Sequence, residues 1–229
     1  MKFVLKIGGS LLFDTKQNLD LSQFKEYAQI ISQLKQEGHE LALVVGGGVL
    51  AKKLVEKGKL LGANRDALDQ LGIAATWVCA QLMIAALEDT AYSTPIMTEE
   101  QLIQLIGTDE LLVLGGLHPR QSTNAVAARV AEILEAKTLV NVTDVDGVYD
   151  RDPKQSKDAK LIRELTINDL RKIVSSLTNE PGSYPLFDHR ALDIIEFGGI
   201  ELWFVNGKPP QNILLAIKDG KIGTRVTIS

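Results

Sequence analysis

The sequence predicts an open α/β protein whose central sheet is largely parallel. Apolar segments of strand length alternate with amphipathic segments of helix length through the 229 residues, and this alternation is typical of parallel strands joined by crossover helices. Several strand-like segments also end in glycine-rich or polar turns. Because ligands collect beyond the carboxyl ends of the strands in such sheets, these turns are the first place to look for a functional site.

The first strand leads a lysine into a glycine turn. Residues 2–7 (KFVLKI) are apolar and β-branched, as in a strand buried on both faces, and Gly8 and Gly9 end it. Successive N–H groups of a glycine turn can bind an anion, and Lys6 beside them would neutralise its charge. A lysine at such a turn is also common at an ordinary solvated strand end, so this motif alone leaves both interpretations open.

The second strand ends in the same way. A helix that Asp20 or Ser22 can cap is predicted to run to about Glu37, and residues 40–45 then form a strand that ends in the glycines of residues 46–48. In a parallel sheet two such turns lie at one edge, so together they indicate a shared anion site.

The remaining elements continue the alternation. They are predicted as a long apolar helix at about 67–87, a strand near 93–97, a helix near 99–106, a strand at 111–114, a helix at 124–134, a strand at 138–142, a short strand near 161, a helix at about 167–174 capped by Thr166, a helix at 188–197, a strand at 201–205, a short helix near 213–217 and a strand at 225–228. The segment 178–185, with two prolines and one glycine, is expected to be a mobile loop.

Polar turns follow two of the later strands. Residues 115–123 (GGLHPRQST) lead into a helix that Ser122, Thr123 or Asn124 could cap, and residues 143–153 carry four aspartates in nine positions. Clustered carboxylates can hold Mg²⁺, but Asp, Gly and Pro also form turns unaided. Both interpretations of these turns stay open at this point.

Composition narrows the class of protein. A net charge of −4 argues against partners held by general electrostatics, such as nucleic acid or an anionic membrane. The single cysteine, Cys79, cannot form an internal disulfide, and we find neither a leader sequence nor an apolar run of the ~18 residues that span a bilayer. We therefore expect a soluble cytoplasmic protein formed by one large domain.

Taken together and in order, four segments resemble the amino acid kinase superfamily and, within it, the archaeal-type uridylate kinases. The resemblance implies a three-layer αβα sandwich in which residues 1–229 form one domain, with an acceptor-binding lobe earlier in the chain and an ATP-binding lobe later. It also implies a kinase that uses ATP and Mg²⁺ to convert UMP to UDP, and a homo-oligomer, expected to be a hexamer. The four segments are residues 6–10 (KIGGS), 44–48 (VVGGG), 115–128 (GGLHPRQSTNAVAA) and 143–153 (TDVDGVYDRDP).

The resemblance also assigns roles to residues. It places Lys6 on the transferring phosphoryl group and Asn124 in the catalytic centre, and leaves the metal ligands unassigned. The residues expected at the nucleotide are Gly8, Gly9, Ser10, Gly48, Lys52, Thr143, Tyr149 and Asp152. Those expected at UMP are Gly47, Asp69 at the sugar, and Leu117, His118, Pro119, Arg120, Gln121, Ser122 and Thr123 around the phosphate.

The chain departs from the family pattern at several positions. Lys52 stands where these kinases usually carry an arginine, so it keeps the charge but loses bidentate recognition of phosphate. Asn124 stands where an aspartate is common, which removes a charge that could orient Lys6 or a metal. In the long helix, Trp77 and Cys79 replace an Arg and an Asn of the archaeal branch, and we interpret both as core residues.

These departures keep other functions open. Isopentenyl phosphate kinases share the superfamily, but they carry a histidine soon after the second glycine turn, and none stands there. A nucleotide-binding protein that stores or senses a metal oxyanion is a second alternative. A dehydrogenase is a third, because Gly46, Gly48 and Ala51 fit the pattern G-x-G-x-x-A, but that pattern belongs on the first strand of its unit and leaves Lys6 unexplained.

Overall fold

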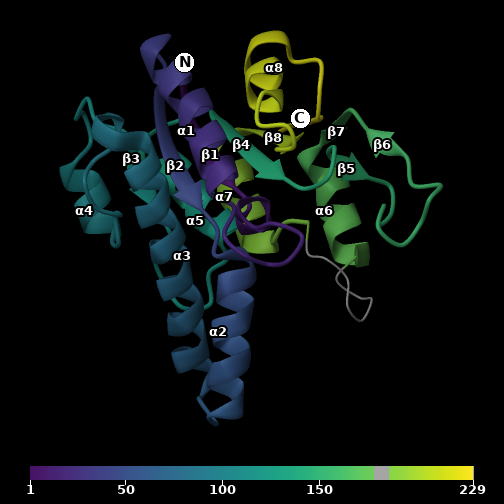
Figure 1. The fold of residues 1–229 in the computed structure, drawn as a ribbon. Coiled ribbons are helices and arrows are strands. Elements are labelled where there is room, and N and C mark those ends of the chain that lie inside the picture. Colours follow the sequence, from purple (N-terminus) through teal and green to yellow (C-terminus); the bar gives the residue numbers. More distant parts are fainter. Residues whose placement is uncertain (178–185, 229) are drawn as a thin grey trace.

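The computed structural model describes residues 1–177 and 186–228, so the segment 178–185, expected to be a mobile loop, lies outside the described residues. A seven-stranded sheet with the order β3-β2-β1-β4-β8-β9-β7 runs through the molecule (Figure 1). Its strands are β1 (Lys2–Ile7), β2 (Glu40–Val45), β3 (Leu112–Leu114), β4 (Thr138–Thr143), β7 (Glu164–Thr166), β8 (Glu201–Asn206) and β9 (Thr224–Thr227). Neighbouring strands are parallel except β8 and β9, which confirms the largely parallel sheet.

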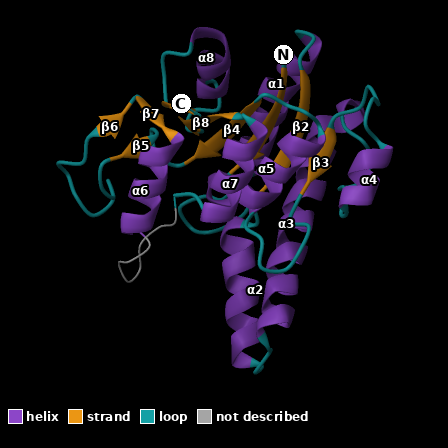
Figure 2. Cartoon of the chain, turned by 180° about the vertical axis from the view of Figure 1, so that it is seen from behind, coloured by secondary structure: helices purple, strands orange, loops and turns teal. Residues whose placement is uncertain are grey.

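Helices cover both faces of the sheet and make the three layers that the family resemblance implied (Figure 2). One face packs on α1 (Leu21–Gln36), α3 (Arg65–Leu87) and α8 (Asn212–Asp219). The other face packs on α4 (Glu99–Gln104), α5 (Thr123–Ile133), α6 (Ile167–Leu177) and α7 (His189–Gly198). Residues that alternate along each strand feed the two faces in turn, because strand side chains have a period of two: Val4 belongs to the second core, whereas Phe3 and Leu5 belong to the first.

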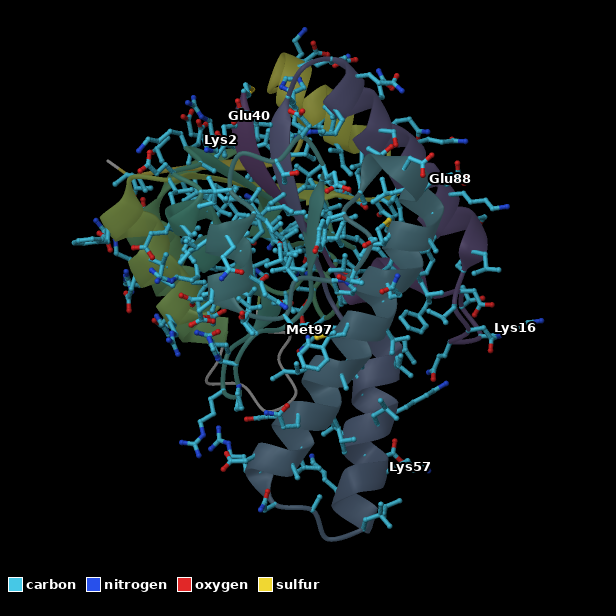
Figure 3. The ribbon with its side chains drawn as sticks, turned by 90° about the vertical axis from the view of Figure 1, so that its left-hand side faces the viewer. Lys2, Lys16, Glu40, Lys57, Glu88 and Met97 are labelled. Carbon is cyan, nitrogen blue, oxygen red and sulfur yellow. The ribbon has the colours of Figure 1, made fainter. Side chains whose placement is uncertain are left out.

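The helix α2 (Gly48–Leu60) and the start of α3 form a hairpin that extends from the body of the molecule (Figure 1). Gly58 is buried where the two helices cross, since a Cβ there would lie 2.6 Å from Leu71 and 2.8 Å from Leu68. Figure 3 shows Lys57 on this hairpin, at the end of the molecule away from Lys2 and Glu40, which form an ion pair of 3.9 Å where β1 and β2 begin. The hairpin therefore extends from the edge of the sheet at which β2 ends, because α2 begins directly after the glycine turn that follows β2.

The structure corrects several element predictions. Residues 93–97 form no strand; only Ala91 and Ile96 make isolated bridges, to Leu111 and Leu114. The short elements η1 (Gly9–Leu12), η2 (Glu88–Thr90) and the antiparallel pair β5 (Val148–Tyr149) and β6 (Leu161–Ile162) were not predicted, apart from the strand near 161. The predicted caps Asp20 and Ser122 are confirmed, because each side chain accepts hydrogen bonds from the first turn of its helix.

The apolar character of α3 was underestimated. The sequence analysis found no apolar run of membrane length, yet an 18-residue window within Arg65–Thr90 has a mean hydropathy of 1.6. In the structure, α3 buries Ile73, Cys79 and Met83 and contacts α1, α2, β2 and β3. The helix is therefore apolar because it packs in the core of a soluble fold.

Candidate active site

The two predicted glycine turns meet at the carboxyl edge of β1 and β2. The Gly46 N–H donates to the Ile7 carbonyl at 3.0 Å, and a Cβ on Gly9 would overlap the main-chain nitrogen of Gly48. Gly48 also has a φ of +52°, a left-handed conformation that glycine adopts without strain. The structure therefore brings the turns together in a contact that leaves no room for side chains.

Lys6 lies on β1 between Val44 of β2 and Asn141 of β4, directly before the turns. It is only 8% exposed, which excludes the alternative interpretation of an ordinary solvated strand end. Burial lowers the pKa of its ammonium from 10.5 to about 8, and the negative charges of Asp144 and Asp188 oppose that shift. The molecule thus holds a desolvated cation against two carboxylates at the edge of the sheet.

Asp188 is a site residue that the sequence analysis missed. It caps the N-terminus of α7 by accepting from the Ala191 N–H at 3.0 Å, and its other oxygen accepts a short hydrogen bond from the Ser122 hydroxyl. Ser122 in turn caps α5, accepting from Ala125 at 3.0 Å. This contact joins two helix N-termini close to Lys6. The signal in the sequence was the position of Asp188 at the start of a helix predicted over 188–197, which by itself indicates only a cap.

Three buried side-chain oxygens at this edge have no hydrogen-bond partner among the described residues: Asn124 Oδ1, Asn141 Oδ1 and Asp144 Oδ1. A buried polar atom without a partner costs roughly 1–3 kcal/mol, so such atoms at a cleft call for a ligand or an ion. Asn124 lies in the first turn of α5, Asn141 lies on β4, and Asp144 follows β4. The Asp144 carboxylate is half satisfied, because Lys154 donates to its other oxygen at 2.8 Å.

The donor chemistry of these oxygens fits a hard divalent cation such as Mg²⁺, which takes carboxylate, amide and phosphate oxygens. Within residues 1–177 and 186–228, no group of three or more His, Cys, Asp or Glu side chains is placed to hold a metal by itself. Any Mg²⁺ here would therefore take ligands from a bound substrate or from water as well.

The four clustered aspartates divide between the site and the turn. Asp144 faces Lys6, whereas Asp146 accepts from Asn206 at 2.7 Å and from the Tyr149 hydroxyl at 3.2 Å. Asp150 and Asp152 accept main-chain N–H groups, from Lys160 at 2.9 Å and from Lys154 at 2.8 Å. Asp150 and Asp152 therefore form turns, as one of the two interpretations from the sequence expected. A small pocket opens beside them and is lined by Val145, Gly147, Tyr149, Arg151, Asp152, Pro153, Lys154 and Leu186.

The loop Gly115–Ser122, here called the 115–122 loop, rests against α3. The Thr76 hydroxyl accepts from the Gly116 N–H at 2.6 Å, and the Trp77 indole N–H donates to the Gly116 carbonyl at 2.9 Å. Cys79 is fully buried, as predicted, but Trp77 is only half-buried and serves this loop as well as the packing. Asp69 also contacts the loop, because its carboxylate accepts from the Arg120 N–H at 3.0 Å.

Among the predicted site residues, Lys6, Gly9 and Gly48 come together at this edge of the sheet, whereas several others are exposed to solvent. His118 is exposed and lies 3.9 Å from Glu99, and Lys52 is exposed on α2. Thr143 receives the Val145 N–H at 3.1 Å and so shapes the turn after β4. Asn206, which the sequence analysis did not single out, tethers this turn through Asp146.

An open parallel sheet with paired glycine turns, a buried lysine and helix N-termini at one edge defines a phosphate-handling α/β protein. The model of the amino acid kinase family matches residues 1–206, and the chain belongs to that family. It is 37% identical to a uridylate kinase of Methanobrevibacter smithii and 38% identical to one of Methanothermobacter thermautotrophicus, each over 226 residues and 99% of both chains. It also resembles the crystal structure of a uridylate kinase from Archaeoglobus fulgidus, with a TM-score of 0.88, 33% identity and coverage of 99% of this chain and 100% of that one.

Proposed function

We propose that this protein is a UMP kinase, which transfers the γ-phosphoryl group of ATP to UMP and so forms UDP for pyrimidine nucleotide synthesis in the cytoplasm. The observation that carries the proposal is the likeness to uridylate kinases over 99% of the chain. The buried Lys6 at the joined glycine turns supports it, because this arrangement suits two phosphates brought end to end.

The two substrates would approach the edge from opposite sides. The β2 and β3 side, with Gly47, Asp69 and the 115–122 loop, is proposed as the acceptor lobe of a single domain spanning 1–229. The β4 and β8 side, with Thr143, Tyr149, Asp152 and the small pocket, is proposed as the ATP lobe, where Gly8, Gly9, Ser10, Gly48 and Lys52 meet the phosphates. Lys6 lies between these sides, since β1 pairs with both β2 and β4.

Phosphoryl transfer needs little covalent chemistry from the protein, so catalysis would rest on position and charge. The Lys6 ammonium would neutralise the charge that develops on the transferring group. The glycine turns would let main-chain N–H groups approach the phosphates, and the N-terminus of α5 would add its partial positive charge. Asp144 and Asp188 would keep Lys6 protonated until the phosphates arrive.

Mg²⁺ is proposed as the metal of the ATP complex, where it would shield the phosphate charges. Asp144, Asn141 and Asn124 are the residues of this chain that would contribute to holding it, because each has a buried oxygen without a partner. Asn124 contributes an amide oxygen without adding negative charge, so the site would rely on Asp144 for its charge.

An alternative is retained because Lys52, Asn124 and Cys79 depart from the family pattern. A protein of this fold could bind nucleotide and another small phosphate, or a metal oxyanion, without converting UMP. Trp77 does not distinguish a UMP kinase from this alternative, since its indole N–H donates to the 115–122 loop in either case. A homo-oligomer, proposed as a hexamer, would be compatible with both functions.

The test is ADP release from MgATP with UMP, CMP, dTMP, AMP, isopentenyl phosphate, molybdate or no acceptor. Strong release with UMP alone is the expected result. Equal release with every acceptor and with none, or no release at all, would contradict the proposal and favour the storage or regulatory alternative. Preferential release with isopentenyl phosphate would reassign the acceptor.

A further inference from the structure

Arg120, in the middle of the 115–122 loop, has a left-handed backbone with a φ of +61°. Residues with a Cβ rarely adopt this conformation because the Cβ approaches the following carbonyl oxygen. An arginine there needs contacts that hold it. The structure provides two, and both come from the N-terminal turns of α3.

The first contact is to the backbone and the second is to the side chain. The Arg120 N–H donates to Asp69 Oδ2 at 3.0 Å, and the guanidinium donates to Asp66 Oδ1, also at 3.0 Å. Asp66 and Asp69 are three residues apart on α3, so they lie on one face of the helix. One face of α3 thus accepts hydrogen bonds from both the main chain and the side chain of the same loop residue.

These contacts complete the attachment of the loop. Gly116 is held at the beginning by Thr76 and Trp77, and Ser122 is held at the end by the cap of α5 and by Asp188. Arg120 is the point between them at which α3 reaches the loop again. Leu117 packs into the core, but the exposed residues after it have no other side-chain anchor on α3 among the contacts of the described residues.

We propose that Arg120 is a positioning residue for the acceptor: its ion pair with Asp66 holds the left-handed turn, and that turn keeps the Arg120 N–H on Asp69. This inference rests on the proposed function, in which Asp69 holds the acceptor's sugar and the loop surrounds its phosphate. A carboxylate has two oxygens, so Asp69 can tie the loop with one and keep the other for a sugar hydroxyl. The sugar and phosphate sites are thereby kept in register.

The size of the effect follows from exposure. The Arg120 and Asp66 side chains are 64% and 66% exposed, and ion pairs in such surroundings are weak and screened by salt. Loss of the pair is therefore expected to raise the KM for UMP by about 3- to 5-fold. The KM for ATP and kcat should stay unchanged, because the pair touches neither the nucleotide pocket nor Lys6.

The experiment compares Arg120→Ala and Asp66→Asn with the double variant and with Arg65→Ala. Arg65 opens the same helix and is exposed, and within the described part of the chain it forms no ion pair, so it controls for the loss of one positive charge. Each single variant should raise the KM for UMP about 3- to 5-fold, and the double variant should show the same rise as either single variant. Arg65→Ala should leave the KM for UMP unchanged. In 0.5 M NaCl the KM of the wild type for UMP should rise toward that of the variants, because salt screens the ion pair.

Two replacements at the same position separate the side chain from the backbone. Arg120→Lys should bind UMP nearly as well as the wild type, because the lysine keeps the positive charge beside Asp66. Arg120→Gly should bind UMP better than Arg120→Ala, because glycine adopts the left-handed turn without help. A KM for UMP in Arg120→Ala equal to that of Arg65→Ala would overturn the inference, and so would an equal rise in the KM for ATP.

Hydrogen exchange separates this inference from the proposed function. In the absence of substrates, Arg120→Ala and Asp66→Asn should speed amide exchange in a peptide covering residues 117–122, while exchange in α5 stays unchanged. If the wild type fails to convert UMP, the proposed function fails, yet faster exchange would still support the tether. Unchanged exchange in both variants would overturn the tether whatever the acceptor.

Discussion

At the residue scale, Lys6 shows how function and stability oppose each other. Its ammonium is buried where it can meet phosphates, and this burial lowers its pKa to about 8 although Asp144 and Asp188 face it. Burying a charge lowers stability unless ion pairs and hydrogen bonds fully compensate for the lost hydration. The unliganded protein therefore carries a destabilising group that its substrates would satisfy.

Lys6→Met should inactivate the protein and stabilise it. We expect kcat to fall at least about 100-fold, and the free energy of unfolding at pH 7 to rise by roughly 1 to 3 kcal/mol, because the cost of the buried charge disappears while Asp144 and Asp188 lose their counter-charge. The folded pKa lies below the unfolded value of 10.5, so the cost is complete below about pH 8 and fades between pH 8 and 10.5.

Urea unfolding of both proteins at pH 7 and pH 10 measures this difference. The gap in stability should be larger at pH 7. A less stable Lys6→Met at both pH values would show that the lysine is a net structural contributor and would contradict the assignment. Unchanged turnover would remove Lys6 from the mechanism.

The pH profile should report the same group. If the charged ammonium is required, kcat/KM for UMP should fall as the pH rises through about 8, because this parameter reports ionisations of the free protein. Bound phosphates favour the charged form, so the falling limb of kcat should lie at higher pH. Steady-state kinetics from pH 6 to 10 would show both limbs. A flat kcat/KM up to pH 10 would mean that the charge on Lys6 is not what the reaction uses.

At the element scale, α3 holds the 115–122 loop on the side of the edge proposed for the acceptor. Its core face is apolar, and its other residues Asp69, Thr76 and Trp77 bind the 115–122 loop. The loop therefore takes several of its hydrogen bonds from a helix in which Thr76 precedes Gly116 by 40 residues. This explains why a largely apolar helix carries polar groups at these positions.

Thr76→Val tests this dependence with a side chain of the same shape. The change leaves the buried Gly116 N–H without an acceptor, which should lower the free energy of unfolding by about 1–3 kcal/mol. The KM for UMP should rise more than the KM for ATP. Thr76→Ser, which keeps the hydroxyl, is the matched control and should retain the affinity. Equal kinetics in Thr76→Val and Thr76→Ser would contradict the role of the hydroxyl.

At the scale of the whole molecule, the two substrate sites proposed on opposite sides of β1 predict that UMP and ATP bind independently. UMP and MgATP, each at about 100 times its Kd, should stabilise the fold by roughly 2.7 kcal/mol, which raises the Tm by about 5–10 °C for a chain of this size. With both present, a non-hydrolysable ATP analogue and UMP should give roughly additive shifts.

Thermal unfolding followed by fluorescence would measure these shifts. A UMP shift that the ATP analogue abolishes would place both ligands in one pocket and contradict the two-lobe proposal. Lys6→Met, which removes no part of the acceptor loop, should retain the UMP shift and serves as the inactive control.

Local patterns in the sequence determined most of the elements. Helix caps at Asp20 and Ser122, glycine turns after β1 and β2, and the alternation of strands and helices all depend on residues within a few positions of each other. The same patterns predicted that the glycine turns share an edge, because parallel strands end on the same side. The strand expected at 93–97 was wrong because only Ile96 in this segment is bridged to the sheet, and Pro95 has no N–H to extend a ladder.

Only the tertiary structure decided the electrostatics of the site and the attachment of the loop. Asp188 reaches Lys6 from 182 positions along the chain, and Arg120 meets Asp66 and Asp69 across more than 50. The burial that lowers the pKa of Lys6 is likewise a property of packed layers. Desolvation and long-range pairing depend on which surfaces the fold brings together, and no sequence pattern of a few residues carries that information.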